Sequence, residues 1–271
     1  MTGRELAGKV AIVTGGAGGL GRGTVEVFAE EGAHVVVADV DPAGGEALAK
    51  ELGPSVAFKQ TDVGEPDQIQ AAVDFAVERF GGLHVMVNNA GIGGSFSRFL
   101  DDDFADFDRV MAVNVLGVMV GSQRAARHMK ANGGGVILNT TSIGGINAGA
   151  GVIAYRASKA AVVHFTRSIA IELARHDIRV NCVAPAHIPT GINADLDQAA
   201  IVRAMQPLQR VGSPRDVGNA MLYLASDRAA QVTGIVLPVD GGTTAGAPPR
   251  SVKDLRAGSS STSSTSSTSS T

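Results

Sequence analysis

The stretch Thr14-Gly15-Gly16-Ala17-Gly18-Gly19-Leu20-Gly21 decides the fold. It comes directly after a β-branched run at residues 9–14 and leads into residues 20–31, where apolar side chains recur every three or four positions. Glycine suits such a loop because the chain must turn sharply and let a pyrophosphate approach the amides at a helix N-terminus. The chain has 35 glycines, so the loop is informative through its place between strand and helix, where it predicts a dinucleotide-binding unit.

The same alternation of strand and helix runs through the chain. Short β-branched runs predict seven strands at residues 9–14, 34–39, 56–60, 84–88, 136–140, 178–184 and 235–239, and helical periods stand at residues 20–31, 66–80, 104–132 and 155–176. Several strand runs are apolar at nearly every position, which is typical of parallel strands covered on both faces. The sequence therefore predicts an α/β protein with a doubly wound, Rossmann-type, seven-stranded parallel sheet in a single domain, and ligands at the carboxyl ends of the strands.

Composition argues against several classes of protein. The 271 residues carry a formal net charge of -3, so no positive field would attract nucleic acid or an anionic membrane. No run approaches about 18 uncharged apolar residues, and residues 1–6 lack the apolar segment of a signal peptide, so we expect a cytoplasmic protein. We expect one domain at residues 1–242 and a flexible tail at residues 243–271, first Gly/Pro-rich and then built of serine and threonine. The one cysteine, Cys182, lies in an apolar run and is expected in the core.

An acidic residue stands at the end of the second predicted strand. Asp39 follows Gly15 by 24 residues, close to the spacing at which a carboxylate meets the adenosine ribose of a dinucleotide. A carboxylate there accepts from the ribose hydroxyls but repels a 2′-phosphate, and the neighbours Val40 and Asp41 supply no cation. The sequence therefore predicts NAD(H) as the cofactor in preference to NADP(H). The alternative is that Asp39 caps a helix or a turn.

A phenol and an ammonium lie four residues apart in Tyr155-Arg156-Ala157-Ser158-Lys159, on one face of a predicted helix. A free phenol has a pKa near 10, which leaves it roughly 4 kcal/mol short of acting as a base at neutral pH. An ammonium about 4.5 Å away would supply roughly 3.5 kcal/mol of this, so we expect Lys159 to lower the pKa of Tyr155. Taken alone, the same spacing also suits a Tyr/Lys pair on a solvated helix face.

Two further polar residues fall where this fold would bring them to the same site. Ser142 follows the strand at residues 136–140, and Asn114 lies within the helix predicted at residues 104–132. The serine can bind a substrate oxygen together with Tyr155 and stabilise the charge that develops there during hydride transfer. Asn114 also suits a polar residue that bends or caps a helix. The set predicts acid/base chemistry at a carbinol or carbonyl group.

The chain resembles the short-chain dehydrogenase/reductase family, in its one-domain form of roughly 250 residues, over residues 6–242. The family's TGxxxGxG loop corresponds to residues 14–21, its adenine-pocket Asp-Val to Asp62-Val63, and its NNAG stretch to Asn88-Asn89-Ala90-Gly91. The resemblance implies Asn114, Ser142, Tyr155 and Lys159 as the catalytic set. It also implies that Lys159 binds the nicotinamide ribose and that Asn114 holds a water that links Lys159 to solvent.

The residues and the resemblance together give a full set of expected cofactor contacts. These are Gly15, Gly18, Gly19, Leu20, Gly21, Asp39, Val40, Asp62, Val63, Asn89, Ala90, Gly91, Tyr155, Lys159, Pro185, Ile188 and Thr190, with no metal ion expected. Where the family usually has Pro-Gly, this chain has Pro185-Ala186, which is expected to narrow the nicotinamide pocket slightly. The resemblance further implies a homo-oligomer, a tetramer, built on the helices at residues 104–132 and 155–176.

The expected activity is that of an NAD-dependent alcohol dehydrogenase or ketone reductase. Three loops, at residues 92–100, 143–152 and 186–209, should select the substrate. Their apolar side chains favour a bulky or cyclic secondary alcohol, such as a steroid, terpenoid or cyclic alcohol, and they are Phe96, Phe99, Ile143, Ile146, Ile153, Ile188, Ile192 and Leu196. Two alternatives stay open: a 3-oxoacyl-thioester reductase, which usually prefers NADP(H), and a nicotinamide-binding regulator without turnover.

Overall fold

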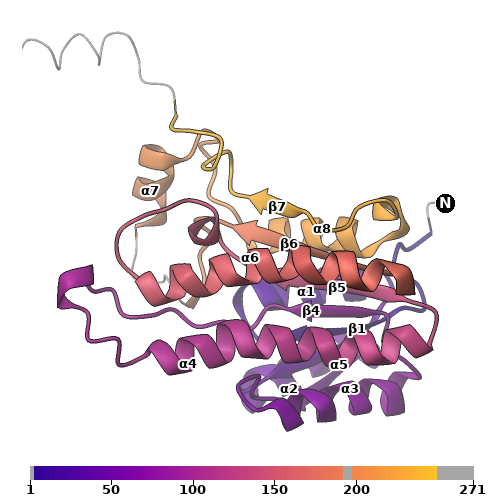
Figure 1. The fold of residues 1–271 in the computed structure, drawn as a ribbon. Helices are drawn as coiled ribbons and strands as arrows, with labels where there is room; N and C mark the ends of the chain where they lie inside the picture. Colours follow the sequence, from indigo (N-terminus) through magenta and orange to yellow (C-terminus); the bar gives the residue numbers. More distant parts are fainter. Residues whose placement is uncertain (1–2, 192–196, 249–271) are drawn as a thin grey trace, which may run out of the picture.

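The computed structural model describes residues 3–191 and 197–248. Within them the chain forms one parallel sheet in the order β3-β2-β1-β4-β5-β6-β7 (Figure 1). The strands are β1 (Val10–Thr14), β2 (His34–Asp39), β3 (Val56–Gln60), β4 (Val85–Asn88), β5 (Gly135–Thr140), β6 (Ile178–Pro185) and β7 (Val236–Val239). The order reverses between β1 and β4, so a crevice opens beyond the carboxyl ends of these two strands.

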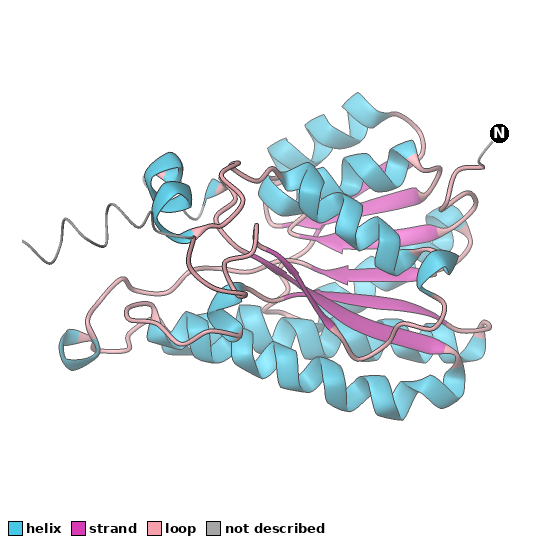
Figure 2. Cartoon of the chain, turned by 90° about the horizontal axis from the view of Figure 1, so that it is seen from above, coloured by secondary structure: helices cyan, strands magenta, loops and turns pink. Residues whose placement is uncertain are grey.

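Helices cover both faces of the sheet, as Figure 2 shows from above. The α-helices are α1 (Gly19–Glu30), α2 (Pro42–Leu52), α3 (Pro66–Phe80), α4 (Phe107–Met111), α5 (Gly117–Ala131), α6 (Ile153–Leu173), α7 (Gln198–Met205) and α8 (Pro214–Ala225). Alternate side chains of β1 explain the two layers, because successive residues of a strand point to opposite faces. Ala11 and Val13 pack in a core with residues of α1, α2 and α8, whereas Val10 and Ile12 pack with residues of α3, α5 and α6.

The predicted strands agree with the observed strands to within one residue at each end. The helix predicted at residues 104–132 is wrong as a single element. It begins only at Phe107 and is interrupted by a π-helical turn, η2 (Ala112–Leu116), between α4 and α5. The carboxylates of Asp102 and Asp103 accept hydrogen bonds from the amides two residues on, at 3.0 Å each, and such local bonds favour turns over helix.

No helix in the described parts of the chain is long and apolar enough to cross a membrane. Cys182 is buried in β6, as its apolar surroundings predict, and burial raises the pKa of its thiol to about 11. The predicted apolar residues Ile192 and Leu196, and most of the tail expected at residues 243–271, lie outside the described residues.

Candidate active site

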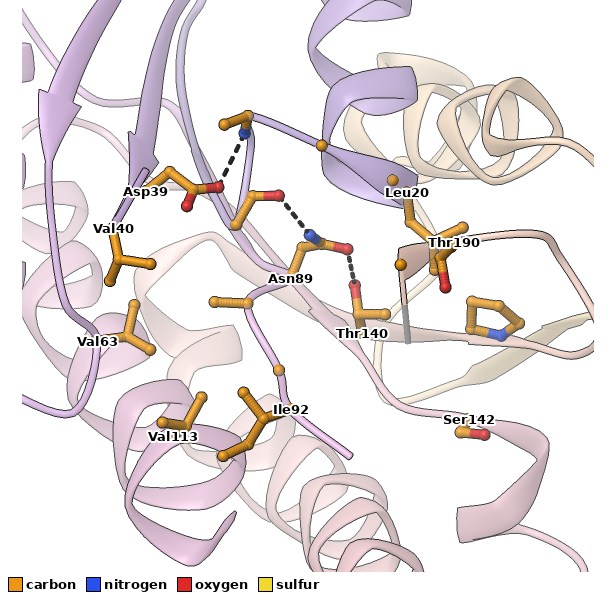
Figure 3. A pocket seen from close by; sticks show the side chains of 18 of the residues that line it. Leu20, Asp39, Val40, Val63, Asn89, Ile92, Val113, Thr140, Ser142 and Thr190 are labelled. Carbon is orange, nitrogen blue, oxygen red and sulfur yellow. Dashed lines mark hydrogen bonds between the residues drawn. The ribbon is translucent and has the colours of Figure 1, made fainter. Parts of the chain in front are cut away.

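A cavity of about 530 Å³ lies at the carboxyl ends of the central strands, where Figure 3 shows it at close range. This volume is within the usual range for small-molecule and cofactor sites. Nearly all the residues predicted to bind a cofactor line it, and they come from the carboxyl ends of β1, β2, β3, β4 and β6, from the segments that follow these strands, and from α6. The lining residues from that prediction are Gly15, Gly18, Gly19, Leu20, Asp39, Val40, Asp62, Val63, Asn89, Ala90, Gly91, Tyr155, Lys159, Pro185, Ile188 and Thr190.

The glycine loop turns between β1 and α1 as the sequence predicts. Gly15 and Gly19 have φ angles of +62° and +51°, in the left-handed region that favours glycine. Gly21 is the one predicted cofactor residue that does not line the cavity. A Cβ there would collide with the carbonyl oxygen of Gly15, so this glycine serves the close packing of α1 against the loop.

The floor of the cavity is held by the hydroxyl of Thr14. Its Oγ1 accepts from the amides of Asn89 at 2.9 Å and Ala90 at 3.0 Å, and it donates to the carbonyl of Val87 at 3.3 Å. The side-chain amide of Asn89 donates back to the Thr14 carbonyl at 3.0 Å. β1 and β4 are therefore cross-linked at the point where the strand order reverses.

Asp39 is oriented by two backbone amides at one end of the cavity. Its carboxylate accepts from Ala17 of the glycine loop at 2.9 Å and from Asp41 at 3.1 Å (Figure 3 shows the first). The cap of α2 is Asp41, whose side chain accepts from the amide of Gly44. The helix cap is therefore Asp41 and not Asp39, whereas the bond from the Asp41 amide shows that Asp39 does cap the turn after β2. Its other oxygen is held next to the phosphate loop.

Four aliphatic side chains from four separate segments form an apolar wall near Asp39. Figure 3 shows Val40, Val63, Ile92 and Val113 on the same side of the cavity. The side chain of Val40 is 58% exposed, which is unusual for a valine and leaves a flat apolar surface for a planar ring. The geometry suits an adenine, with the carboxylate of Asp39 beside its ribose.

Arg109 of α4 also lines the cavity, and sequence reasoning did not find it. Arg109 precedes Val113 of the apolar wall by four residues, so its positive charge lies on the side of the cavity that this wall forms. Asp39 approaches the cavity from a different segment, at the end of β2. Val113 was not predicted either, so the sequence held no local signal for Arg109.

Lys159 lies deep in the site, with only 3% of its surface exposed. Its Nζ donates to the carbonyl of Thr140 at 3.0 Å and lies 5.7 Å from the centre of the Tyr155 ring. Burial lowers the pKa of this ammonium from 10.5 to about 8. The lysine therefore keeps most of its charge at neutral pH, and it faces the same space as the phenol.

The expectation that Lys159 lowers the pKa of Tyr155 is wrong for the chain alone. Burial raises the pKa of the phenol, and this effect outweighs two opposing ones: a hydrogen bond with Ser142 and the positive charge of Arg156. The hydrogen bond brings together Tyr155 and Ser142, as the sequence predicts. Without a dinucleotide, the phenol is held in its protonated form.

Asn114 lies in the π-helical turn and is fully buried. Its Oδ1 accepts from the amide of Ile92 at 2.9 Å, and its Nδ2 donates to the carbonyl of Ile92 and the hydroxyl of Ser158, both at 3.0 Å. It does not line the cavity. A Cβ on Gly91 would lie 3.1 Å from the Lys159 Nζ and 3.3 Å from the Asn114 Oδ1, so the glycine leaves open the space between these two groups.

The segment after β6 closes the opposite end of the cavity through Pro185, Ala186, Ile188 and Thr190. Thr190 approaches the glycine loop, since a Cβ on Gly19 would lie 3.4 Å from its methyl group. His187 instead lines a second cavity beside the C-terminal end of β7. Of the apolar residues predicted to contact substrate, Ile188 lines the main cavity, whereas Phe96, Phe99 and Ile146 are exposed and do not.

The residues present fit a dinucleotide. Gly15 and Gly19 leave a cradle at the helix N-terminus, which attracts phosphate, and the apolar wall and Asp39 suit an adenosine. Beyond the adenosine, Tyr155 and Lys159 line the same cavity as Thr190. In the described part of the chain, no cluster of three His, Cys, Asp or Glu side chains could hold a metal ion.

Comparison with known proteins agrees with this geometry. A family model described as Enoyl-(Acyl carrier protein) reductase matches residues 15–244. The (+)-borneol dehydrogenase 2 of Salvia officinalis is 41% identical over 89% of this chain and 90% of its own. The 3-alpha-(or 20-beta)-hydroxysteroid dehydrogenase of Mycobacterium tuberculosis is 41% identical over 91% of this chain and 93% of its own.

A solved structure has the same fold over nearly its whole length. It is a 3-ketoacyl-(acyl-carrier-protein) reductase from Brucella melitensis complexed with NADH, with a TM-score of 0.84, 36% identity, and coverage of 88% of this chain and 99% of that one. Relatives named as dehydrogenases and as reductases are thus similar to this chain over most of its length. The chain belongs to the short-chain dehydrogenase/reductase family.

Proposed function

We propose that this protein is an NAD-dependent alcohol dehydrogenase or ketone reductase that acts on the CH–OH group of a cyclic or bulky apolar secondary alcohol. The observation that carries the proposal is that Tyr155, Ser142 and Lys159 line one cavity with the glycine loop and Asp39. The names of the borneol and hydroxysteroid dehydrogenases support a cyclic substrate.

In the proposed mechanism, the hydroxyl of Ser142 binds the substrate oxygen beside the phenol of Tyr155. When bound, NAD+ would supply the hydride acceptor for the carbinol carbon, and the glycine loop, Asp39 and Lys159 would hold it. For oxidation, Tyr155 acts as its phenolate, after its own proton has passed toward solvent, and it takes the hydroxyl proton as the carbon loses its hydride, so that the alcohol becomes a ketone. In the reverse direction the phenol gives its proton to the substrate oxygen. The ammonium of Lys159 stabilises the phenolate form of Tyr155.

Asn114 and Lys159 are proposed to support this proton transfer from the buried side of the site. The Lys159 ammonium donates to Thr140, which leaves two further donors on the nitrogen. The Asn114 oxygen accepts one hydrogen bond and has a second lone pair. We infer that a water between these groups carries the proton on toward solvent.

Cofactor choice is proposed to follow from the charges at the adenosine end. Asp39 is fixed by two amides and cannot turn away from a 2′-phosphate without breaking both bonds. Arg109 also lines the cavity, but it comes from α4 and not from the end of β2, which carries Asp39. We therefore infer a preference for NAD(H).

A steady-state assay tests the proposal. Bicyclic, cyclohexanol-type and steroid secondary alcohols are offered with NAD+ or NADP+, and reduced nicotinamide is followed by its absorbance. We expect turnover of at least one cyclic alcohol with NAD+, and little with NADP+. No turnover with any alcohol or ketone, although NADH binds, would favour a nicotinamide-binding regulator, and a preference for NADP+ would contradict the role of Asp39.

A reductase of 3-oxoacyl thioesters is the second candidate, because the solved relative carries that name. That relative is complexed with NADH, so cofactor preference alone does not separate the two activities. The separation comes from substrate: a thioester such as acetoacetyl-CoA should be reduced with NADH at a kcat/KM well below that for cyclic ketones.

We further propose a homotetramer in the cytoplasm, with the domain boundary at Gly242. The exposed apolar side chains of Leu116 and Met119, on η2 and α5, and of Ile171 on α6 support burial against another subunit. Sedimentation of the purified chain tests the oligomer, and removal of residues 249–271 tests whether the tail contributes to activity.

A further inference from the structure

The loop between β5 and α6 joins Ser142 to the helix of Tyr155, and it has little means of holding its own shape. Of residues 143–151, four are glycine and two are alanine, and residues 146–150 are exposed. Gly145 packs closely against the backbone of Lys159, but burial cannot fix the exposed part at residues 146–150. Yet the loop joins the two residues that are proposed to meet the substrate oxygen, Ser142 and Tyr155, both of which line the cavity.

Backbone bonds order only the first half of this loop. The amides of Gly145, Ile146 and Asn147 donate to carbonyls of residues 142 and 143, which makes the short helical turn η3 (Ile143–Gly145). Within the described chain, residues 148–151 make one hydrogen bond: the carbonyl of Gly151 accepts from the Nε of Arg156 at 3.2 Å. The second half of the loop thus depends on one side chain.

Arg156 is the residue next to Tyr155, and the loop winds around its guanidinium. Besides Gly151, its Nη1 reaches the carbonyl of Asn147 at 3.4 Å. A Cβ on Gly149 would lie only 2.6 Å from Nη2, and a Cβ on Gly144 would lie 3.5 Å from Nη1. The guanidinium therefore bonds to two loop carbonyls and occupies the space next to Gly149 that a side chain there would need.

The bond to Gly151 stands next to a strained residue. Val152 has a φ of +44°, which is rare for a β-branched side chain, and it caps the N-terminus of α6. Such a conformation persists only where neighbouring contacts impose it. The Arg156 side chain donates to the carbonyl of Gly151, and its backbone amide donates to the carbonyl of Val152. These two bonds hold the strained residue and the residue before it.

We propose that Arg156 is a positioning residue that fastens the loop at residues 143–151 to α6, and so shapes the substrate side of the active site. The proposal rests on the proposed function for its effect on catalysis, but not for its effect on the loop. Arg156 does not line the cavity, so it acts through the loop and not by contact with substrate. Its charge also lowers the pKa of Tyr155.

Two variants disturb the contact from opposite sides. Arg156→Met keeps the aliphatic stem and removes both donors. Gly149→Ala leaves Arg156 in place but puts a methyl group where the guanidinium lies, and a flexible side chain can move away without straining the backbone. Arg167→Met, at an exposed arginine of the same helix, is the matched control.

Hydrogen exchange followed by mass spectrometry gives the first readout, and it needs no substrate. Loss of a net charge-assisted hydrogen bond corresponds to roughly a tenfold change in a local opening equilibrium. We expect the amides of residues 144–147, which donate hydrogen bonds within the loop, to exchange about tenfold faster in Arg156→Met and Gly149→Ala, with β5 and most of α6 unchanged. Arg156→Lys, which offers a point charge without the planar fork, should restore protection in part.

Kinetics give the second readout. With a cyclic alcohol that the wild type oxidises, KM for the alcohol should rise about tenfold in both variants, whereas the Kd for NADH should stay within about twofold. Unchanged exchange at residues 144–147 in both variants, or equal loss of NADH affinity, would overturn the proposal. If the wild type oxidises no alcohol, the proposed function fails while the exchange experiment still decides whether Arg156 holds the loop.

Discussion

The side-chain amide of Asn114 and the backbone of Ile92 form a reciprocal pair, with hydrogen bonds of 2.9 and 3.0 Å in the two directions. This pair joins the π-helical turn between α4 and α5 to the loop that follows β4. An asparagine can satisfy both backbone groups at once because its amide carries a donor and an acceptor side by side. The loop beside the reactive end of the site is therefore anchored in the core.

Replacement of Asn114 with leucine should destabilise the fold as well as impair turnover. It leaves both polar groups of Ile92 unpaired, and the free energy of unfolding should fall by about 2–4 kcal/mol. Urea denaturation followed by circular dichroism measures this. The control is Asn132→Leu at the exposed end of α5, where a loss of similar size would show that the pair with Ile92 is not responsible.

Removal of the phenolic oxygen should separate chemistry from binding. In Tyr155→Phe we expect kcat to fall by about 10³-fold, because the proton acceptor is lost. NADH binding, measured by fluorescence titration, should change by less than about twofold, since the glycine loop and Asp39 are untouched. Tyr223→Phe, at the exposed tyrosine of α8, is the control, and turnover that survives in Tyr155→Phe would refute the assignment of the acid/base.

The buried ammonium of Lys159 should make stability rise with pH over a defined window. Its pKa is about 8 in the folded chain and near 10.5 when unfolded, so between these values the unfolded state binds more protons. The folded state is then penalised by about 3 kcal/mol below pH 8, and the penalty disappears as the pH rises toward 10.5. Thermal unfolding of the wild type and of Lys159→Met, compared from pH 7 to pH 10, should show the two midpoints diverge in favour of the wild type as the pH rises. A constant difference would contradict the lowered pKa.

Exchange of charge at the adenosine end should change the preferred cofactor. In the double variant Asp39→Ser, Val40→Arg, we expect kcat/KM with NAD+ to fall and with NADP+ to rise, each by about tenfold or more. Val40 is exposed at the cavity, so an arginine there can reach a 2′-phosphate without disturbing the core. Asp41→Asn removes a nearby negative charge and keeps the cap of α2, and it should leave the preference unchanged.

Substitution by alanine should lower the stability of the fold strongly at Gly21 and hardly at Gly18, although both belong to the same loop. A methyl group at Gly21 collides with the Gly15 carbonyl, and we expect the free energy of unfolding to fall by more than about 2 kcal/mol. Gly18 has an extended φ of -147° and open space around its Cβ, so Gly18→Ala should change stability by less than about 0.5 kcal/mol. Because Gly18 lines the cavity, its alanine variant should still bind NADH more weakly. Equal melting temperatures for the two variants would contradict the packing role of Gly21.

The positions of the strands and most of the site could be predicted from the sequence because they depend on short-range patterns. Buried parallel strands are continuous apolar runs, and the loops that follow them carry the polar residues. Asp39, Ser142 and Lys159 stand where a strand or a helical turn fixes them, so their convergence at one edge of the sheet follows from topology alone. The seven strands accordingly match to within one residue.

The parts that could not be predicted depend on contacts between distant segments. Nothing local shows that Asn114 lies in a π-helical turn, because its partner Ile92 is 22 residues away. The pKa of Tyr155 depends on how deeply the fold buries the phenol, and a spacing of four residues to Lys159 does not contain that information. Nothing in the sequence around Arg156 distinguishes it from an ordinary surface arginine. Only the path of the loop in the folded chain places its guanidinium next to glycines.

The threonine hydroxyl at the end of β1 has one more consequence. With one oxygen it unites two amides and a carbonyl from the neighbouring strand, so the two halves of the sheet cannot splay apart beneath the cavity. The backbone beneath the cavity is then already ordered before a dinucleotide binds, so the protein loses little conformational entropy on binding. The slow step in binding and release of the dinucleotide should accordingly be a movement of the loops that line the cavity, such as the segment after β6, and not a bending of the sheet.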